Sequence, residues 1–140
     1  MGKPQTAERV SQRDASDNYV FQRSLLAYVY AAERVGGRVL EIGTGSGYGV
    51  EVIAPKAEHF LTIDKHTPAV ELIENHPNVE FRAMTVPPLA GIADESVDCV
   101  ISFQVIEHIK QDCEFVREVH RVLKKGGKFI VSTPNRTMSL

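Results

Sequence analysis

The sequence predicts one α/β domain built on an open, doubly wound and mostly parallel sheet with helices on both faces. A chain of 140 residues with 43% hydrophobic and 24% charged residues is typical of a single globular domain. Short apolar runs of strand length alternate with segments of helical periodicity, which is the pattern of parallel strands joined by helices. Right-handed connections in such a sheet place the carboxyl ends of the strands along one edge, where ligands bind.

Nine elements are expected after a polar and flexible stretch at residues 1–15. In chain order they are a cap helix at 16–35, a strand at 38–42, a helix at 46–54, a strand at 60–64, a helix at 68–75, strands at 79–83 and 97–102, a helix at 111–124 and a strand at 129–132. Helix limits follow from caps and breakers. Gly36-Gly37 ends the cap helix, Pro55 ends the second, and Thr67 caps the third with Pro68 at its first position.

The last predicted helix has the clearest C-terminal signature. Apolar residues recur at helical spacing from Phe115 to Leu123. Arg121, Lys124 and Lys125 are expected in its last turn, where cations favour the helix dipole, and Gly126-Gly127 follows.

The loop after the first strand carries the strongest ligand signal. Four glycines alternate from Gly43 to Gly49, so the backbone can turn sharply and let a ligand approach closely. A dinucleotide fingerprint needs a third glycine five positions after the first, and Tyr48 and Val50 occupy the two candidate positions. No Gly-Lys-Ser/Thr of a phosphate loop follows. A plain strand-to-helix turn is the alternative, although one or two glycines would satisfy it.

Two acids accompany this loop. Glu41 lies where a buried strand normally has valine or isoleucine, and we interpret the partner of this buried charge as a cationic ligand. Asp64 ends the second strand, 21 positions after Gly43, from where a carboxylate can accept both hydroxyls of a ribose. An ordinary turn aspartate is the alternative. The predicted ligand therefore has a ribose, no pyrophosphate, and positive charge near Glu41.

These motifs resemble the class I S-adenosylmethionine-dependent methyltransferases of the small-molecule, methyltransferase-11-like type. The resembling segments are 39–47 (an acid, then Gly-x-Gly-x-Gly), 60–64, 94–101, 105–109 and 121–127. The resemblance covers about residues 34–135. It implies a Rossmann-like fold, S-adenosyl-L-methionine as the cofactor, and one cofactor-binding domain over 1–140 with its core at 36–135. Family members continue past the fifth strand with a helix and two antiparallel strands, so we expect a fragment that lacks the C-terminal strands and part of the acceptor site.

The resemblance also implies which residues hold the cofactor. The set comprises Glu41, Gly43, Thr44, Gly45, Gly47, Asp64, Lys65, Met84, Thr85, Phe103 and Gln104. The loop backbone would line the methionine and ribose parts, with Glu41 on the ammonium side and Asp64 on the ribose. Lys65 would flank the adenine, and Phe103 with Gln104 would form the floor beneath the methyl group. The acid that often follows the third strand is absent here, and Met84 or Thr85 takes its place unless Met84 is simply tucked into the core.

Methyl transfer from a sulfonium requires of the protein mainly that it positions the reactants in a preorganised site from which water is excluded. A general base is needed only if the acceptor must lose a proton, and Glu107 and His108 are the candidates. A helix-start histidine in contact with backbone is the alternative. Gln104, Glu107 and His108 also resemble the Glu-x-x-Glu-His metal site of ubiquinone-pathway and small-RNA 2′-O-methyltransferases. Glutamine in the first position removes a charge, so no metal is predicted.

The cap helix carries an aromatic group formed by Tyr19, Phe21, Tyr28 and Tyr30. In similar enzymes this region covers the cofactor and the acceptor. Packing of the helix onto the core is the other interpretation.

The charge balance of the sequence bears on which classes of partner the protein is expected to bind. A net charge of −2 and a pI near 6.2 do not favour nucleic acid or an anionic membrane surface. Cys99 and Cys113 are interpreted as reduced thiols of a cytoplasmic protein. The expected function is methyl transfer by in-line displacement to an O, N or C nucleophile of a small-molecule acceptor, with a possible homodimer through an exposed sheet edge. The alternatives are a non-catalytic cofactor-binding module and a metal-assisted 2′-O-methyltransferase acting on RNA.

Overall fold

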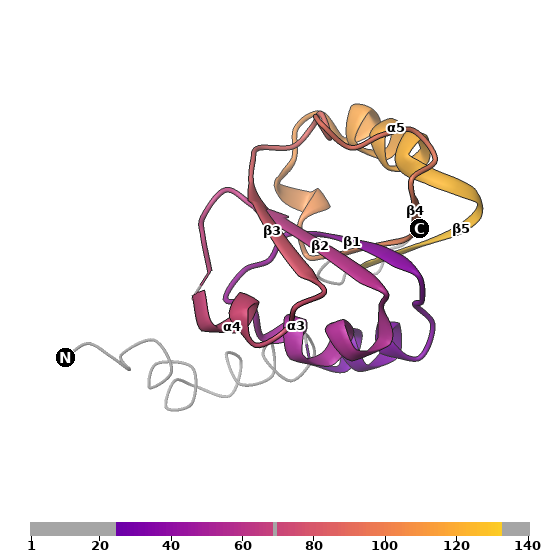
Figure 1. Ribbon diagram of the computed structural model, residues 1–140. Helices are drawn as coiled ribbons and strands as arrows, with labels where there is room; N and C mark the ends of the chain where they lie inside the picture. Colours follow the sequence, from indigo (N-terminus) through magenta and orange to yellow (C-terminus); the bar gives the residue numbers. More distant parts are fainter. Residues whose placement is uncertain (1–24, 69, 133–140) are drawn as a thin grey trace.

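The computed structural model of the chain describes residues 25–68 and 70–132, so the stretch 1–15 and the start of the predicted cap helix lie outside the described residues. Five strands form one sheet in the order β3-β2-β1-β4-β5, and every neighbouring pair is parallel (Figure 1). This confirms the predicted fold class. The elements after the helical residues 25–32 are β1 (Arg38–Ile42), α3 (Tyr48–Ile53), η1 (Ala54–Lys56), β2 (His59–Asp64), α4 (Val70–Glu74), β3 (Val79–Ala83), β4 (Val97–Phe103), η2 (Ile106–His108), α5 (Asp112–Val122) and β5 (Leu123–Ser132).

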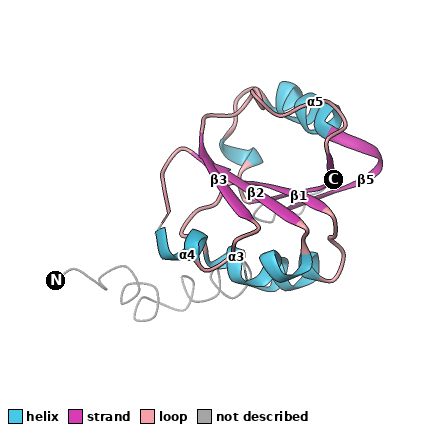
Figure 2. Cartoon of the chain, in the orientation of Figure 1, coloured by secondary structure: helices cyan, strands magenta, loops and turns pink. Residues whose placement is uncertain are grey.

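The sheet separates two apolar clusters. Helices α3 and α4 lie on one face and α5 on the other (Figure 2). Successive side chains of a strand point to opposite faces, so Val39 packs with Tyr28 and the α3 side, whereas Leu40 packs with Phe115 of α5. Glu41 follows the alternation of Val39 and is buried with it. No described helix is long and apolar enough to cross a membrane.

The strand order fixes where a ligand can bind. The chain runs outward from β1 to β2 and β3, then returns to the other side of β1 for β4 and β5. The switch point therefore lies at the carboxyl ends of β1 and β4, where the connecting loops leave the sheet in opposite directions. The glycine loop follows β1 at this place.

The last predicted helix is too long, because α5 ends at Val122 and β5 begins at Leu123. Leu123 has extended dihedral angles (φ −78, ψ 136) and pairs with Val97, while Lys128 pairs with Cys99. Residues 124–127 therefore bulge from the ladder. Gly126, with φ +79, belongs to this bulge and does not cap a helix.

Two other helices are shorter than predicted. The expected helix at 46–54 begins only at Tyr48, because Gly47 has φ +92, a left-handed conformation that precedes the first helical residue. Pro55 lies inside the 3-10 turn η1, which extends the helical path by one turn. Helix α4 covers Val70–Glu74 within the predicted 68–75.

Candidate cofactor site

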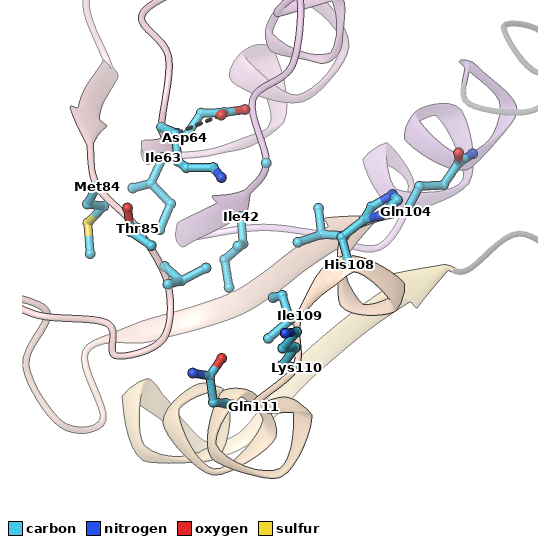
Figure 3. Close-up of a pocket in the computed structure, with 14 residues that line it drawn as sticks. Ile42, Ile63, Asp64, Met84, Thr85, Gln104, His108, Ile109, Lys110 and Gln111 are labelled. Carbon is cyan, nitrogen blue, oxygen red and sulfur yellow. Dashed lines mark hydrogen bonds between the residues drawn. The ribbon is translucent and has the colours of Figure 1, made fainter.

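A cavity of about 410 Å³ lies at the carboxyl edge of the sheet. Figure 3 shows Asp64, Met84 and Thr85 on one side of it and His108 on the other, with Ile42 between them. Its lining comes from the carboxyl ends of β1 and β2 and from the segments that follow β1, β2, β3 and β4: Ile42, Gly43, Ile63, Asp64, Lys65, Met84, Thr85, Val86, Gln104, Val105, His108, Ile109, Lys110 and Gln111. A concave, mainly apolar space with a few polar groups is typical of small-molecule sites.

The glycine loop reaches the cavity through Gly43. The N–H groups of Gly43 and Thr44 both donate to the carbonyl oxygen of Ile63, at 2.8 and 3.1 Å, which fastens the loop to β2. Gly43 has φ +100, and a Cβ there would lie 2.5 Å from Cγ2 of Val105. The loop can therefore take this path only with glycine at position 43.

Asp64 organises the ends of β1 and β2. Its Oδ2 accepts from the N–H of Gly45 at 2.8 Å, and its Oδ1 accepts from the N–H groups of Lys65 at 2.6 Å and His66 at 3.3 Å. An ionised carboxylate offers about four acceptor positions. Asp64 thus retains acceptor capacity for a ligand hydroxyl while it holds the loop.

Glu41 lies beneath the loop and does not line the cavity. Its side chain is 1% exposed, Thr62 donates to its Oε1 at 2.6 Å, and the hydroxyl of Tyr28 donates to its Oε2. Burial raises the pKa of Glu41 to about 7, although both hydroxyls act to lower it. The buried carboxylate therefore does not need a cationic ligand as its partner, and a cationic ligand near Glu41 stays a prediction. The chain itself supplies two hydroxyl partners, and one of them comes from a helix that a strand motif cannot reveal.

Phe103, the last residue of β4, and Gln104, which follows it, differ in the spaces that they line. The ring of Phe103 packs edge-on against Tyr28, with centroids 4.9 Å apart, and lines a second groove beside β5 instead of the cavity. Gln104 lines both spaces. Its φ of +61 is unusual for a residue with a side chain, and its N–H donates to the carbonyl oxygen of Ser132 at 2.8 Å. Strain of this kind is most often retained at functional positions.

His108 lines the cavity, and Glu107 does not. The Nε2 atom of His108 lies 3.4 Å from Oε2 of Glu107, and its backbone N–H donates to the carbonyl oxygen of Val105 at 2.9 Å. The side chain of His108 is 77% exposed. His108 is the last residue of η2, so the predicted helix-start position is wrong, although its backbone contact and its place at the cavity are present. Among the described residues no group of three or more His, Cys, Asp or Glu side chains could hold a metal ion.

A family described as a methyltransferase domain matches residues 40–131, which is more than half of the chain. The chain belongs to the class I S-adenosylmethionine-dependent methyltransferases. S-adenosyl-L-methionine is the cofactor of this family, as the sequence predicted.

Curated relatives agree with this assignment. A probable S-adenosylmethionine-dependent methyltransferase of Mycolicibacterium smegmatis is 42% identical over 135 residues, which are 95% of this chain and 52% of that protein. A ubiquinone biosynthesis O-methyltransferase of Xanthomonas oryzae pv. oryzae is 33% identical over 118 residues, which are 80% of this chain and 49% of that protein. The chain spans about half the length of the curated relatives it matches.

Solved structures show the same fold. YcgJ from Bacillus subtilis matches with a TM-score of 0.61 at 28% identity, over 79% of this chain and 50% of that one. The DhpI–SAH complex matches with a TM-score of 0.61 at 23% identity, over 88% of this chain and 63% of that one. The second similarity is evidence for the fold alone.

The donor set of this methyltransferase cavity fits an adenosine group. Ile42, Ile63 and Val86 give apolar walls for a flat base, and the Asp64 carboxylate supplies a hydroxyl acceptor at the same cavity. The missing acid after β3 is replaced at the wall by Met84 and Thr85. Met84 also packs against the apolar cluster on the α5 face, and its place beside the adenine stays a prediction.

Seven lining residues of the methyltransferase cavity were not predicted as site residues: Ile42, Ile63, Val86, Val105, Ile109, Lys110 and Gln111. For Val105 the signal was indirect, since the glycine at position 43 is required by the methyl group of Val105. Ile109, Lys110 and Gln111 connect η2 to α5; Ile109 ends the resembling segment 105–109 without a role implied for it, and Lys110 and Gln111 belong to no motif. Only the return of the chain over the cavity brings them there.

Proposed function

We propose that the protein catalyses S-adenosylmethionine-dependent methyl transfer by in-line displacement to an O, N or C nucleophile of a small-molecule acceptor. The observation that carries the proposal is the convergence of the glycine loop and Asp64 on one apolar cavity at the switch point. The bound cofactor supplies a methyl group on a positively charged sulfur, so that the acceptor lone pair forms the new bond while the carbon–sulfur bond breaks.

We assign the holding of the cofactor to the predicted residues. Asp64 accepts from the ribose hydroxyls, and Lys65 with Met84 and Thr85 flanks the adenine. The backbone of Gly43, Thr44 and Gly45 lines the ribose and methionine parts, and Gly47 allows the turn into α3. Glu41 stabilises the ammonium side electrostatically from beneath the loop, because it does not open onto the cavity. Phe103 and Gln104 border the space beside the methyl group, since Gln104 joins the cavity to the second groove.

The protein then has two tasks at the reacting atoms, positioning and, for acceptors that must lose a proton, acceptance of that proton. His108 is the candidate base because it lines the cavity and its side chain is exposed. Glu107 orients the imidazole through the 3.4 Å contact.

The acceptor is proposed as a small molecule by analogy with the ubiquinone biosynthesis O-methyltransferase among the relatives. The methylated atom stays open. The cytoplasmic location, the absence of nucleic-acid and membrane partners, and a homodimer through an exposed sheet edge stay predictions; β3 and β5 are the two edge strands.

Calorimetric titration with S-adenosylhomocysteine tests the proposal. The chain should bind it, and Asp64→Asn should weaken binding about 10- to 100-fold, the effect of lost hydrogen bonds to a charged group. Glu71→Gln, an exposed carboxyl on α4, is the matched control and should bind like the wild type. No binding by the wild-type chain would refute the proposal. Binding without methyl transfer to any acceptor pool would favour the non-catalytic module.

A further inference from the structure

Tyr28 lies where four parts of the fold meet. Its ring packs edge-on against Tyr48 of α3 at 5.7 Å and against Phe103 of β4 at 4.9 Å between centroids. The ring also lies against Gly49 in the first turn of α3, where a Cβ would overlap with Cε1 of Tyr28, so this packing requires glycine at position 49. Tyr28 is 6% exposed, and its hydroxyl donates to Glu41 of β1.

The hydrogen bond to Glu41 continues to the glycine loop. Thr62 uses its single hydroxyl proton to donate to Glu41 at 2.6 Å. The hydroxyls of Thr44 and Thr62 are 2.6 Å apart, and the Thr62 proton is already used, so Thr44 is the donor in this second bond. Thr44 therefore donates to Thr62, and Thr62 donates to Oε1 of Glu41. Tyr28 donates to the other carboxylate oxygen of Glu41, Oε2.

This chain of hydrogen bonds ends inside the cofactor loop. Thr44 stands between the two glycines whose backbone is proposed to line the cofactor, and it is 3% exposed. Its hydroxyl therefore anchors the loop from behind, while Asp64 anchors it in front through the N–H of Gly45. Removing the donor at Tyr28 leaves a buried carboxylate with one partner fewer, which is costly in an apolar surrounding.

We infer that Tyr28 is a positioning residue for the cofactor: its hydroxyl orients Glu41 and, through Thr62, holds Thr44 and the glycine loop in the binding conformation. The inference rests on the proposed function. Sequence reasoning left Tyr28 as one of several aromatics of a cap helix and gave its hydroxyl no role.

Electrostatics agree with this geometry. Burial raises the pKa of Glu41, and the hydrogen bond from Tyr28 opposes that rise. The other ionisable groups that act on the pair are Asp64 on β2, which also raises the pKa of Glu41, and Tyr48 on α3, which acts on Tyr28. Tyr28 thus keeps more of Glu41 ionised at neutral pH, where a negative carboxylate favours an ammonium group above the loop.

Tyr28→Phe tests the inference, with affinity for S-adenosylhomocysteine measured by calorimetry between pH 6 and 8.5. The variant should bind about tenfold more weakly at pH 7, the loss expected for a hydrogen bond to a charged group. Affinity should rise with pH as Glu41 ionises, and in Tyr28→Phe this rise should move to higher pH. If Tyr28 had a purely structural role, Tyr28→Phe would lower the affinity for S-adenosylhomocysteine at every pH but would leave the midpoint pH of the rise in affinity unchanged.

Substitutions of Thr62 provide a second, independent test of the inference. Thr62→Val removes the middle hydroxyl at nearly constant shape and should weaken binding, while Thr62→Ser keeps the hydroxyl and should restore it. Ser96→Ala removes a hydroxyl that donates to the carbonyl oxygen of Ala93 at 2.7 Å, before the start of β4, and is the matched control.

If the wild type binds and both Tyr28→Phe and Thr62→Val bind within twofold of it with an unmoved pH profile, the positioning role is wrong. Failure of the wild type to bind would instead remove the proposed function itself.

Discussion

Replacement of Glu41 by glutamine should stabilise the protein at neutral and alkaline pH. Glutamine keeps the shape of the side chain and two polar atoms that the hydroxyls of Thr62 and Tyr28 can pair with, but it removes the buried charge. The carboxyl is 1% exposed and has hydroxyl partners but no cation among the described ion pairs, so its ionised form is poorly solvated. The substitution therefore measures the free energy that ionisation of the buried carboxyl costs the folded protein.

The sign follows from proton binding. Burial raises the pKa of Glu41 from its ordinary 4.5 to about 7, so the folded chain holds a proton that the unfolded chain has released within this range. The contribution of Glu41 to stability is fully present below pH 4.5 and is lost as pH rises through 7. At about 1.4 kcal/mol for each pH unit, the loss amounts to roughly 3 kcal/mol. The advantage of Glu41→Gln over the wild type should grow by about this amount from pH 4.5 to pH 8.

Urea unfolding of the wild type and the variant at pH 4.5, 6, 7 and 8 measures this difference in the free energy of unfolding. Glu118→Gln is a control with the opposite sign, because the guanidinium of Arg121 lowers the pKa of Glu118. The excess in the free energy of unfolding of the wild type over Glu118→Gln should therefore shrink as the pH falls. A Glu41→Gln difference that stays constant within about 0.5 kcal/mol across the range would show that Glu41 does not titrate as the burial demands.

Two further substitutions test the site itself. Gly43→Ala places a Cβ 2.5 Å from Val105 at a φ of +100, so it should lower the free energy of unfolding by about 1–3 kcal/mol and weaken S-adenosylhomocysteine binding. Gly45→Ala places its Cβ in open space at φ +59 and should lower the free energy of unfolding by less. Thermal melts and calorimetry compare the two variants, and equal effects would contradict the role of Val105. His108→Ala should reduce kcat by about 10²- to 10⁴-fold on an acceptor that loses a proton while S-adenosylhomocysteine affinity stays near that of the wild type; an unchanged pH–rate profile would assign the base elsewhere.

Much of the fold was predictable because its signals are local. The runs at 38–42 and 79–83 match β1 and β3, and Asp64 ends β2 as predicted. Boundaries failed where tertiary pairing overrides local preference. The basic residues Lys124 and Lys125 favour a helix end, but pairing of Leu123 with Val97 draws them into β5.

The sequence by itself determined the fold class, the glycine loop and the two acids beside it, because strand periodicity, glycine spacing and a carboxylate at a strand end are properties of neighbouring residues. Only the tertiary structure decided what Glu41 contacts, because Tyr28 precedes it by 13 residues and Thr62 follows it by 21. It likewise decided that Val105 crowds Gly43 and that Lys110 lines the cavity. Such contacts depend on how the chain returns to the switch point, and no local pattern encodes that return.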